Sequence, residues 1–189
     1  MNATVVGASG YSGRQLVSLL VNHSKINLVE VTSRSYFGKT VESCIPHLRG
    51  KAKGLTFTNP SIEDLATNQQ CELFFLAVPH GTAAEYAIPL LEAGKKVIDL
   101  SADFRLLTAE CYEEFYGSPH PAPAWLERAT YGLPEIHSLS WEKSPLIASP
   151  GCYPTSIIIP LFPLLQKGLI EENDIVVNSM SGVSGAGRN

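Results

Sequence analysis

Short apolar runs alternate along the chain with longer segments in which apolar residues recur at helical spacing. The apolar runs are T-V-V-G (4–7), N-L-V-E-V-T-S (27–33), G-L-T-F-T (54–58), E-L-F-F-L-A-V (72–78), K-V-I-D-L-S (96–101) and P-L-I-A-S (145–149). Runs of this length predict buried strands. Helices are predicted between them at about 12–23, 61–67 and 82–93. The alternation is typical of parallel βαβ units and predicts an α/β fold with a doubly wound parallel sheet.

The regular alternation ends in the C-terminal part of the chain. The segment 118–135 is rich in proline and is predicted to be a loop. After the last apolar run, a buried helix is expected to begin at Pro154, with Pro160 and Pro163 interrupting it. The run D-I-V-V-N-S-M (174–180) is predicted to be a strand, followed by a Gly/Ser loop. A lone strand cannot satisfy its own backbone. We therefore expect one domain over 1–149 and, over 150–189, the start of a second α+β catalytic or dimerisation domain that is cut off.

Composition excludes several classes of protein. The chain has 189 residues, of which 44% are hydrophobic, so it can bury a core of ordinary size. Its formal net charge of -4 argues against nucleic acid as the main partner, because phosphate binding requires clustered lysine and arginine. The chain contains no run of about 18 apolar residues, so no membrane-spanning helix is expected. Without a signal-peptide pattern at the N-terminus, the expected location is cytoplasmic.

A glycine-rich turn follows the first predicted strand. The turn reads G-A-S-G-Y-S-G (7–13), between a strand and a helix, where glycines let the backbone approach a pyrophosphate. The spacing departs from the strict G-x-G-x-x-G pattern, and the alternative is a turn needed only for close packing of helix on strand. We interpret it as a Rossmann-type dinucleotide site. The residues predicted to bind the cofactor here are Gly7, Ser9, Gly10, Tyr11, Ser12 and Gly13.

The tip of the second predicted strand indicates which dinucleotide is used. Ser33 and Arg34 lie there, where a hydroxyl and a guanidinium can hold a 2′-phosphate. Glu30 lies earlier in the strand and is expected to point elsewhere. NADP is therefore predicted in preference to NAD.

The chain has four cysteines, Cys44, Cys71, Cys111 and Cys152, with no spacing that suggests zinc, and no metal is expected. Three of them read as ordinary free thiols. Cys152 differs because it lies in P-G-C-Y-P-T (150–155), just before the predicted helix. The N–H groups and dipole of a helix N-terminus favour a thiolate and can stabilise an oxyanion. The alternative for Cys152 is a small thiol buried at a bend.

Taken together, the motifs resemble the N-acetyl-γ-glutamyl-phosphate reductase family of the semialdehyde dehydrogenase superfamily. The resemblance covers essentially the whole chain. It rests on G-A-S-G-Y-S-G (7–13), F-L-A-V-P-H-G (75–81), D-L-S-A-D-F-R (99–105), Y-G-L-P-E (131–135), P-G-C-Y-P-T (150–155) and S-G-V-S-G-A-G-R (181–188).

The resemblance implies a two-step reaction of arginine biosynthesis. Cys152 would attack N-acetyl-γ-glutamyl phosphate, release phosphate and form a thioester, which NADPH reduces to N-acetylglutamate 5-semialdehyde. The family's general acid/base histidine belongs to the half that follows residue 189, so we expect the chain by itself to be weakly active or inactive. The full-length protein is expected to be a homo-oligomer.

Other motif residues receive roles with alternatives. Arg105 is predicted to clamp a substrate carboxylate or phosphate, the alternative being a surface salt bridge. His80 is predicted to line the cofactor pocket or, as an alternative, to carry a proton. Glu135 reads as a cap or a pocket wall, and Ser184 and Gly185 are expected, by resemblance, against the reactive end of the cofactor. The remaining histidines are predicted to lie on the surface: His23, His47, His120 and His137.

Three other functions remain open. The first is an aspartate-semialdehyde dehydrogenase, although that family places its cysteine in N-C-x-T rather than G-C-Y-P-T. The second is a non-catalytic dinucleotide-binding module, which would bind NADPH tightly with an unreactive Cys152. The third is thiol redox sensing, which is weakened because no resolving cysteine lies nearby in the sequence.

Overall fold

The computed structural model describes residues 1–136 and 143–187, and within these residues the strands form a seven-stranded sheet in the order β3-β2-β1-β4-β5-β7-β6. Every neighbouring pair in this sheet is parallel. The strands are β1 (Asn2–Val6), β2 (Asn27–Thr32), β3 (Phe57–Thr58), β4 (Leu73–Leu76), β5 (Lys96–Asp99), β6 (Thr130–Tyr131) and β7 (Leu146–Ala148). The parallel, doubly wound α/β sheet predicted from the sequence is confirmed.

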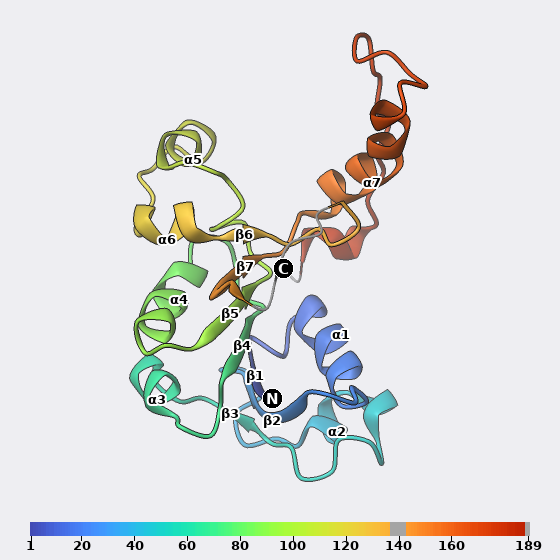
Figure 1. Cartoon of the computed structure of the whole chain (residues 1–189). Helices are drawn as coiled ribbons and strands as arrows, with labels where there is room; N and C mark the ends of the chain where they lie inside the picture. Colours follow the sequence, from blue (N-terminus) through green and yellow to red (C-terminus); the bar gives the residue numbers. More distant parts are fainter. Residues whose placement is uncertain (137–142, 188–189) are drawn as a thin grey trace.

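The helices cover both faces of the sheet, with α3 and α4 on one side and α1 and α2 on the other (Figure 1). The α-helices are α1 (Tyr11–Leu20), α2 (Val41–Cys44), α3 (Ile62–Thr67), α4 (Ala83–Glu92), α5 (Ala109–Tyr116), α6 (Pro123–Arg128) and α7 (Cys152–Gln166). Two short 3₁₀ helices, η1 (Pro46–Leu48) and η3 (Val183–Ala186), complete the described elements.

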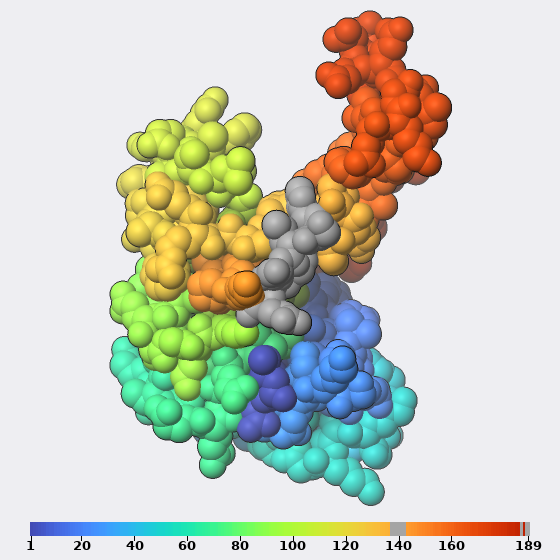
Figure 2. Space-filling model, viewed as in Figure 1, coloured from blue at the N-terminus to red at the C-terminus, as the bar shows by residue number. Residues whose placement is uncertain are grey.

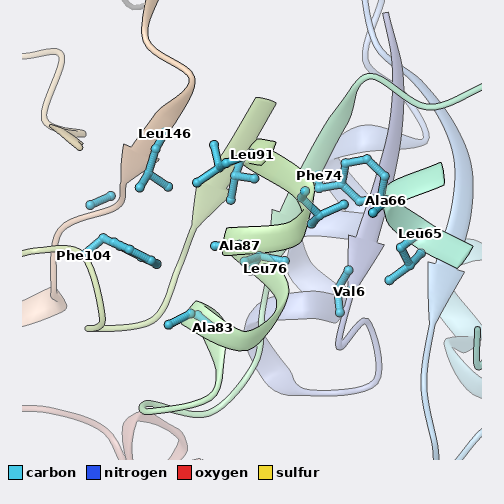
Figure 3. Packing of buried hydrophobic residues seen from close by; sticks show 14 of the residues in the cluster. Val6, Leu65, Ala66, Phe74, Leu76, Ala83, Ala87, Leu91, Phe104 and Leu146 are labelled. Atoms are coloured by element: carbon cyan, nitrogen blue, oxygen red, sulfur yellow. The ribbon is translucent and has the colours of Figure 1, made fainter. Parts of the chain in front are cut away.

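The sheet separates two hydrophobic cores. Along β4 the side chains alternate, with Phe74 and Leu76 in the core beneath α3 and α4, and Leu73 and Phe75 in the core beneath α1 and α2. Figure 3 shows Phe74 and Leu76 with Ala87 of α4 in the first core. Burial on both faces explains why the strands read as continuous apolar runs. Each fully buried large side chain stabilises the fold by about 1.5–3 kcal/mol.

Local signals set the ends of the central helices. Ser61 caps α3 in a reciprocal capping box with Asp64. Gly94 follows the C-terminus of α4 with φ +75°, a left-handed conformation that glycine adopts without steric cost. These two elements were predicted almost to the residue.

The segment 118–135 contains more structure than the predicted loop. It forms α6 and then β6, which pairs in parallel with β7 at the edge of the sheet. Pro123 occupies the first turn of α6, where its missing N–H has no intrahelical acceptor to lose. The prolines of this segment therefore start an element rather than prevent one.

Helix α7 differs from its prediction in three ways. It begins at Cys152 rather than Pro154, and it continues through Pro160 and Pro163. None of its residues is buried. Because the helix is exposed, water can reach the backbone carbonyls that the two prolines leave without an N–H donor, and the helix is not broken.

The predicted strand at 174–180 is absent from the structure, which shows no strand there. Parallel pairing needs a neighbouring strand, and in the described residues this segment belongs to no sheet. With α7 it forms an arm that projects from the body (Figure 2). Among the residues that the structure describes, no helix is long and apolar enough to cross a membrane.

Candidate active site

The predicted site residues follow the carboxyl ends of neighbouring strands. The glycine turn follows β1, Ser33 and Arg34 follow β2, and His80 follows β4. Arg105 lies after β5, and Cys152 after β7. Because all strands run in the same direction, these loops meet at one edge of the sheet. In open α/β sheets this edge is where ligands bind.

Two glycines of the turn are required by close backbone contacts. Gly7 has φ +80°, and a Cβ there would collide with the carbonyl oxygen of Ala77. A Cβ at Gly13 would lie 2.5 Å from the carbonyl oxygen of Gly7 and 2.8 Å from Cα of Ala8. Gly10 is different, because its nearest neighbour would be 3.7 Å away. Close packing of helix on strand therefore accounts for Gly7 and Gly13 but not for Gly10.

The N-terminus of α1 is open to an anion. Its N-cap is Gly10, which has no side chain to cap the helix, and the first turn contains no acidic residue. By contrast, Thr40, Ser61 and Thr108 cap α2, α3 and α5 with their side chains. The first N–H groups of a helix lack intrahelical acceptors and, with the helix dipole, favour negative charge. The turn thus fits a pyrophosphate group.

A small cavity, here called the side pocket, lies on one side of the glycine turn. It has a volume of about 270 Å³, and its lining includes Gly7, Ser9, Ser33, Arg34 and Ser35. Arg34 is exposed, whereas Ser33 is buried. The Ser33 hydroxyl oxygen accepts a hydrogen bond from the Tyr36 N–H at 3.2 Å, so Ser33 shapes the turn that presents Arg34.

Glu30 is turned away from the side pocket. The hydroxyl of Thr58 in β3 donates to the Glu30 carboxylate at 2.8 Å. The carboxylate that an NAD enzyme would direct at the ribose hydroxyls is therefore engaged with β3.

A larger groove, here called the main groove, lies on the other side of the turn. Its volume is about 990 Å³. It brings together most of the remaining predicted site residues: Gly10, Tyr11, Ser12, His80, Arg105, Cys152, Ser184 and Gly185. Val78 lines both cavities, and Ser9 of the side pocket precedes Gly10 of the main groove. An elongated ligand that occupied both cavities would pass the N-terminus of α1.

Gly13 lies outside both linings. It is buried against the glycine turn, so the structure gives it a packing role and no direct position at a ligand.

Cys152 is exposed, which rules out the alternative of a thiol buried at a bend. It is the first residue of α7, whose N-cap is Gly151, and no side chain caps this helix. The main groove is therefore lined by the first turns of two long helices, α1 and α7, each begun by a glycine. At α7 the first N–H groups lie next to the thiol of Cys152 rather than next to a second glycine turn.

Arg105 holds the turn that carries Cys152. Its Nε donates to the carbonyl oxygen of Ser149 at 2.7 Å, and its Nη2 donates to the carbonyl oxygen of Leu100 at 2.9 Å. Its Nη1 lies near Gly151, where a Cβ would be 3.2 Å away. Arg105 is thus half-buried between β5 and β7 and bonded to backbone carbonyls, which contradicts the alternative of a surface salt bridge.

Two buried carboxylates, one at the end of β5 and one in the loop after it, were not assigned by the sequence interpretation. Asp99 accepts hydrogen bonds from the N–H and the hydroxyl of Ser101 at 2.8 and 2.7 Å. Burial raises the pKa of Asp99 to about 6, although the bonds from Ser101 act in the opposite direction. Asp103 accepts from the N–H groups of Gly81 and Ala84. The two aspartates and the serine of the motif D-L-S-A-D-F-R were the sequence signal that could have identified these carboxylates.

Aromatic side chains at the rim of the main groove were also missed. Tyr116, Tyr131 and Tyr153 line it, from α5, β6 and α7. Burial raises the pKa of the Tyr131 hydroxyl, and the nearby Arg105 opposes that rise. Tyr131 and Tyr153 lie in the motifs Y-G-L-P-E and P-G-C-Y-P-T, but their place in the groove, like that of Tyr116, depends on the fold that brings α5 and β6 there.

His120 is buried, and its predicted surface position is wrong. The ring fits inside because both nitrogens have backbone partners: Nε2 lies 2.9 Å from the Asp103 carbonyl oxygen, and Nδ1 accepts from the Ala122 N–H. Phe104 and Tyr112 pack on it edge to face. Burial lowers the pKa of His120.

The remaining predictions concern residues outside the two cavities. His23 and His47 are exposed, as predicted, and His137 lies outside the described residues. Glu135 is exposed in a turn. Cys71 is buried, whereas Cys44 and Cys111 are partly buried. In residues 1–136 and 143–187, no group of three or more histidine, cysteine or acidic residues is placed to hold a metal.

Comparison with protein families gives two matches along the chain. A model described as semialdehyde dehydrogenase, NAD binding domain, matches residues 2–144. A second model, described as semialdehyde dehydrogenase, dimerisation domain, matches residues 152–189. The first match alone covers most of the chain and includes the glycine turn, Asp99 and Asp103.

Several curated proteins are similar over nearly the whole chain. The N-acetyl-gamma-glutamyl-phosphate reductase of Akkermansia muciniphila is 49% identical over 189 residues, which are 100% of this chain and 54% of that protein. The proteins of the same name from Desulfotalea psychrophila and Pseudomonas fluorescens are 49% and 46% identical over 97% of this chain and 52% and 53% of theirs. The chain therefore spans about half the length of the curated relatives it matches.

Solved structures with low sequence identity share the fold. Aspartate semialdehyde dehydrogenase II of Vibrio cholerae superposes with a TM-score of 0.66 at 18% identity, over 99% of this chain and 48% of that one. The aspartate semialdehyde dehydrogenase of Candida albicans, solved with NADP, gives 0.60 at 16% identity, over 88% and 47%. At such identities the likeness describes the architecture alone.

Proposed function

Because the chain belongs to the semialdehyde dehydrogenase family, we propose that it carries the cofactor-binding part and the nucleophile of an N-acetyl-γ-glutamyl-phosphate reductase. The full-length enzyme reduces N-acetyl-γ-glutamyl phosphate to N-acetylglutamate 5-semialdehyde in arginine biosynthesis, in the cytoplasm and as a homo-oligomer. The observation that carries the proposal is the position of Cys152, exposed at the start of α7 in the same groove as the first turn of α1. One ligand at α1 and another at Cys152 can therefore meet.

NADP(H) fits the two cavities better than a smaller cofactor. The side pocket would hold the adenosine end, the N-terminus of α1 the pyrophosphate, and the main groove the nicotinamide end. Arg34 at the rim of the side pocket holds the 2′-phosphate, since Glu30 is engaged with Thr58. Ser184 and Gly185, which line the main groove, would hold the other end of the cofactor.

The first chemical step belongs to the cysteine. The Cys152 thiolate attacks the acyl carbon, a carbon–sulfur bond forms, and the carbon–oxygen bond to phosphate breaks with its electron pair leaving on phosphate. The first N–H groups of α7 stabilise the oxyanion that develops on the acyl oxygen. Arg105 keeps the turn in place through Ser149 and directs Nη1 towards the region of the leaving phosphate.

The second step converts the thioester to the aldehyde. NADPH, when bound, supplies the hydride. The sulfur of Cys152 leaves as a thiolate and is ready for another cycle. The groove residues around it orient the acyl group and exclude water, since hydrolysis of the thioester competes with reduction.

Intact-mass spectrometry tests the nucleophile and the substrate together. We expect incubation with N-acetyl-γ-glutamyl phosphate to give one N-acetylglutamyl adduct on the chain, because acylation needs the thiol and the first turn of α7. Cys152→Ser should abolish this adduct, whereas Cys111→Ser, which changes a partly buried cysteine on α5, should retain it. An adduct with aspartyl phosphate but none with the N-acetylglutamyl substrate would contradict the proposed substrate. An adduct that survives Cys152→Ser would contradict the proposed nucleophile.

A further inference from the structure

His80 has one ring nitrogen engaged by the protein. Its Nδ1 accepts a hydrogen bond from the backbone N–H of Ala102 at 2.8 Å. A ring nitrogen that accepts a hydrogen bond carries no hydrogen, so the hydrogen of the neutral imidazole is on Nε2. The loop after β5 therefore selects the tautomer of a histidine in the loop after β4.

The backbone next to His80 is held by the same loop. The buried carboxylate of Asp103 accepts hydrogen bonds from the N–H of Gly81 at 2.7 Å and from the N–H of Ala84 at 3.2 Å. Gly81 has φ +78°, which allows the chain to turn sharply after His80 and enter α4. Ala102 and Asp103, adjacent in sequence, thus hold the ring and the backbone of one turn.

The other side of the ring offers a donor to a ligand. In the part of the chain that the structure describes, Nε2 of His80 has no hydrogen-bond partner, and the ring lines the main groove together with Gly10, Tyr11 and Cys152. With a pyrophosphate at the N-terminus of α1 and the reacting carbon at Cys152, the nicotinamide half of the dinucleotide must pass between them. His80 lines this same groove.

We propose that His80 is a cofactor-binding residue whose Nε2–H donates a hydrogen bond to an oxygen of the nicotinamide half of NADP(H). This inference rests on the proposed function, because it assumes that the dinucleotide spans both cavities. It assigns His80 a fixed donor role in place of the proton-carrier alternative. Asp103 and Ala102 are positioning residues that act through His80.

Binding of two ligands to the full 189-residue chain separates this role from a general effect on the site. NADP⁺ contains the nicotinamide half, whereas adenosine 2′,5′-bisphosphate contains only the adenosine half with its 2′-phosphate. His80→Asn retains a side-chain acceptor for the Ala102 N–H and lacks the distal donor. We expect it to weaken NADP⁺ binding about five- to tenfold in isothermal titration calorimetry, as one lost hydrogen bond would, and to leave bisphosphate binding unchanged.

His80→Gln serves as the matched variant, because its amide N–H₂ can reach the position of Nε2. We expect it to restore part of the NADP⁺ affinity lost in His80→Asn. Circular dichroism and the thermal unfolding midpoint show whether both variants are folded like the wild type.

Two outcomes would overturn the inference alone. One is NADP⁺ binding by His80→Asn at wild-type affinity, and the other is an equal loss for both ligands, which would mean that His80 only shapes the site. Failure of the wild-type chain to bind either ligand would overturn the inference together with the proposed cofactor site.

Discussion

At the end of β5, the carboxyl group of Asp99 is completely buried and is bonded to Ser101. A raised pKa means that the folded chain binds a proton on Asp99 at a pH at which the unfolded chain does not. The stabilisation from Asp99 is therefore complete below its ordinary pKa of 3.8 and is lost as the pH rises through about 6. Above that pH the charged carboxylate remains buried beside Arg105, at a cost to stability.

Asp99→Asn should reveal this pH dependence. Each pH unit in which only the folded chain binds the proton changes the free energy of unfolding by about 1.4 kcal/mol. We expect the free energy of unfolding of the wild type, minus that of the variant, to fall by about 2–3 kcal/mol between pH 4 and pH 7. Urea denaturation at several pH values measures it. A constant difference across this range would show that Asp99 does not titrate there.

At the scale of elements, the packing of α1 on β1 depends on Gly13 more than on Gly10. The two residues are neighbours on the same turn, yet a Cβ at Gly13 would meet backbone at 2.5 and 2.8 Å, and a Cβ at Gly10 would meet nothing closer than 3.7 Å. Backbone atoms cannot move aside as the end of a long side chain can. Helix α1 would have to shift away from the turn, and the N–H groups at its N-terminus would shift with it.

The pair Gly13→Ala and Gly10→Ala tests this difference. We expect Gly13→Ala to lower the free energy of unfolding by about 1–3 kcal/mol, because overpacking outweighs the better helix propensity of alanine. Gly10→Ala should change it by less than about 0.5 kcal/mol. Urea denaturation at constant pH compares them. Equal stability of the two variants would contradict the packing role of Gly13.

At the scale of the whole molecule, the body and the arm are stabilised differently. The body has a core on each face of the sheet, whereas α7 has no buried residue and the arm exposes large apolar side chains. Val176, Met180 and Val183 are 84%, 99% and 93% exposed. Exposed apolar surface of this kind is typical of regions that pack against another element or another chain, and a family model described as a dimerisation domain matches this region.

Truncation after Ser149 tests the predicted domain boundary. Because the removed residues contribute nothing to either core, we expect the unfolding midpoint of residues 1–149 to stay within about 4 °C of that of the full chain. Adenosine 2′,5′-bisphosphate should still bind, since the side pocket is lined by residues before the boundary. Differential scanning calorimetry with and without the bisphosphate measures both. Loss of cooperative unfolding would mean that the arm is part of the folding unit.

The sequence by itself determined the features that depend on neighbouring residues. The strands up to β5 and the helices α1, α3 and α4 follow from apolar runs, from the capping box at Ser61 and from Gly94, which act within a few residues. The short helices α2 and η1 were not predicted. The glycine turn and the cysteine at the start of a helix are equally local. Such signals specify the order of elements and hence the parallel sheet.

Tertiary structure decided the features that depend on residues far apart in the chain. Arg105 reaches Ser149 across 44 residues, and Asp103 reaches Gly81 across 22. The burial of His120 depends on Asp103, 17 residues away. The exposure of α7 and the missing strand at 174–180 have the same origin, because a segment is buried or paired only where the fold supplies a partner. Local sequence specifies what a segment can form, and strand order decides what it contacts.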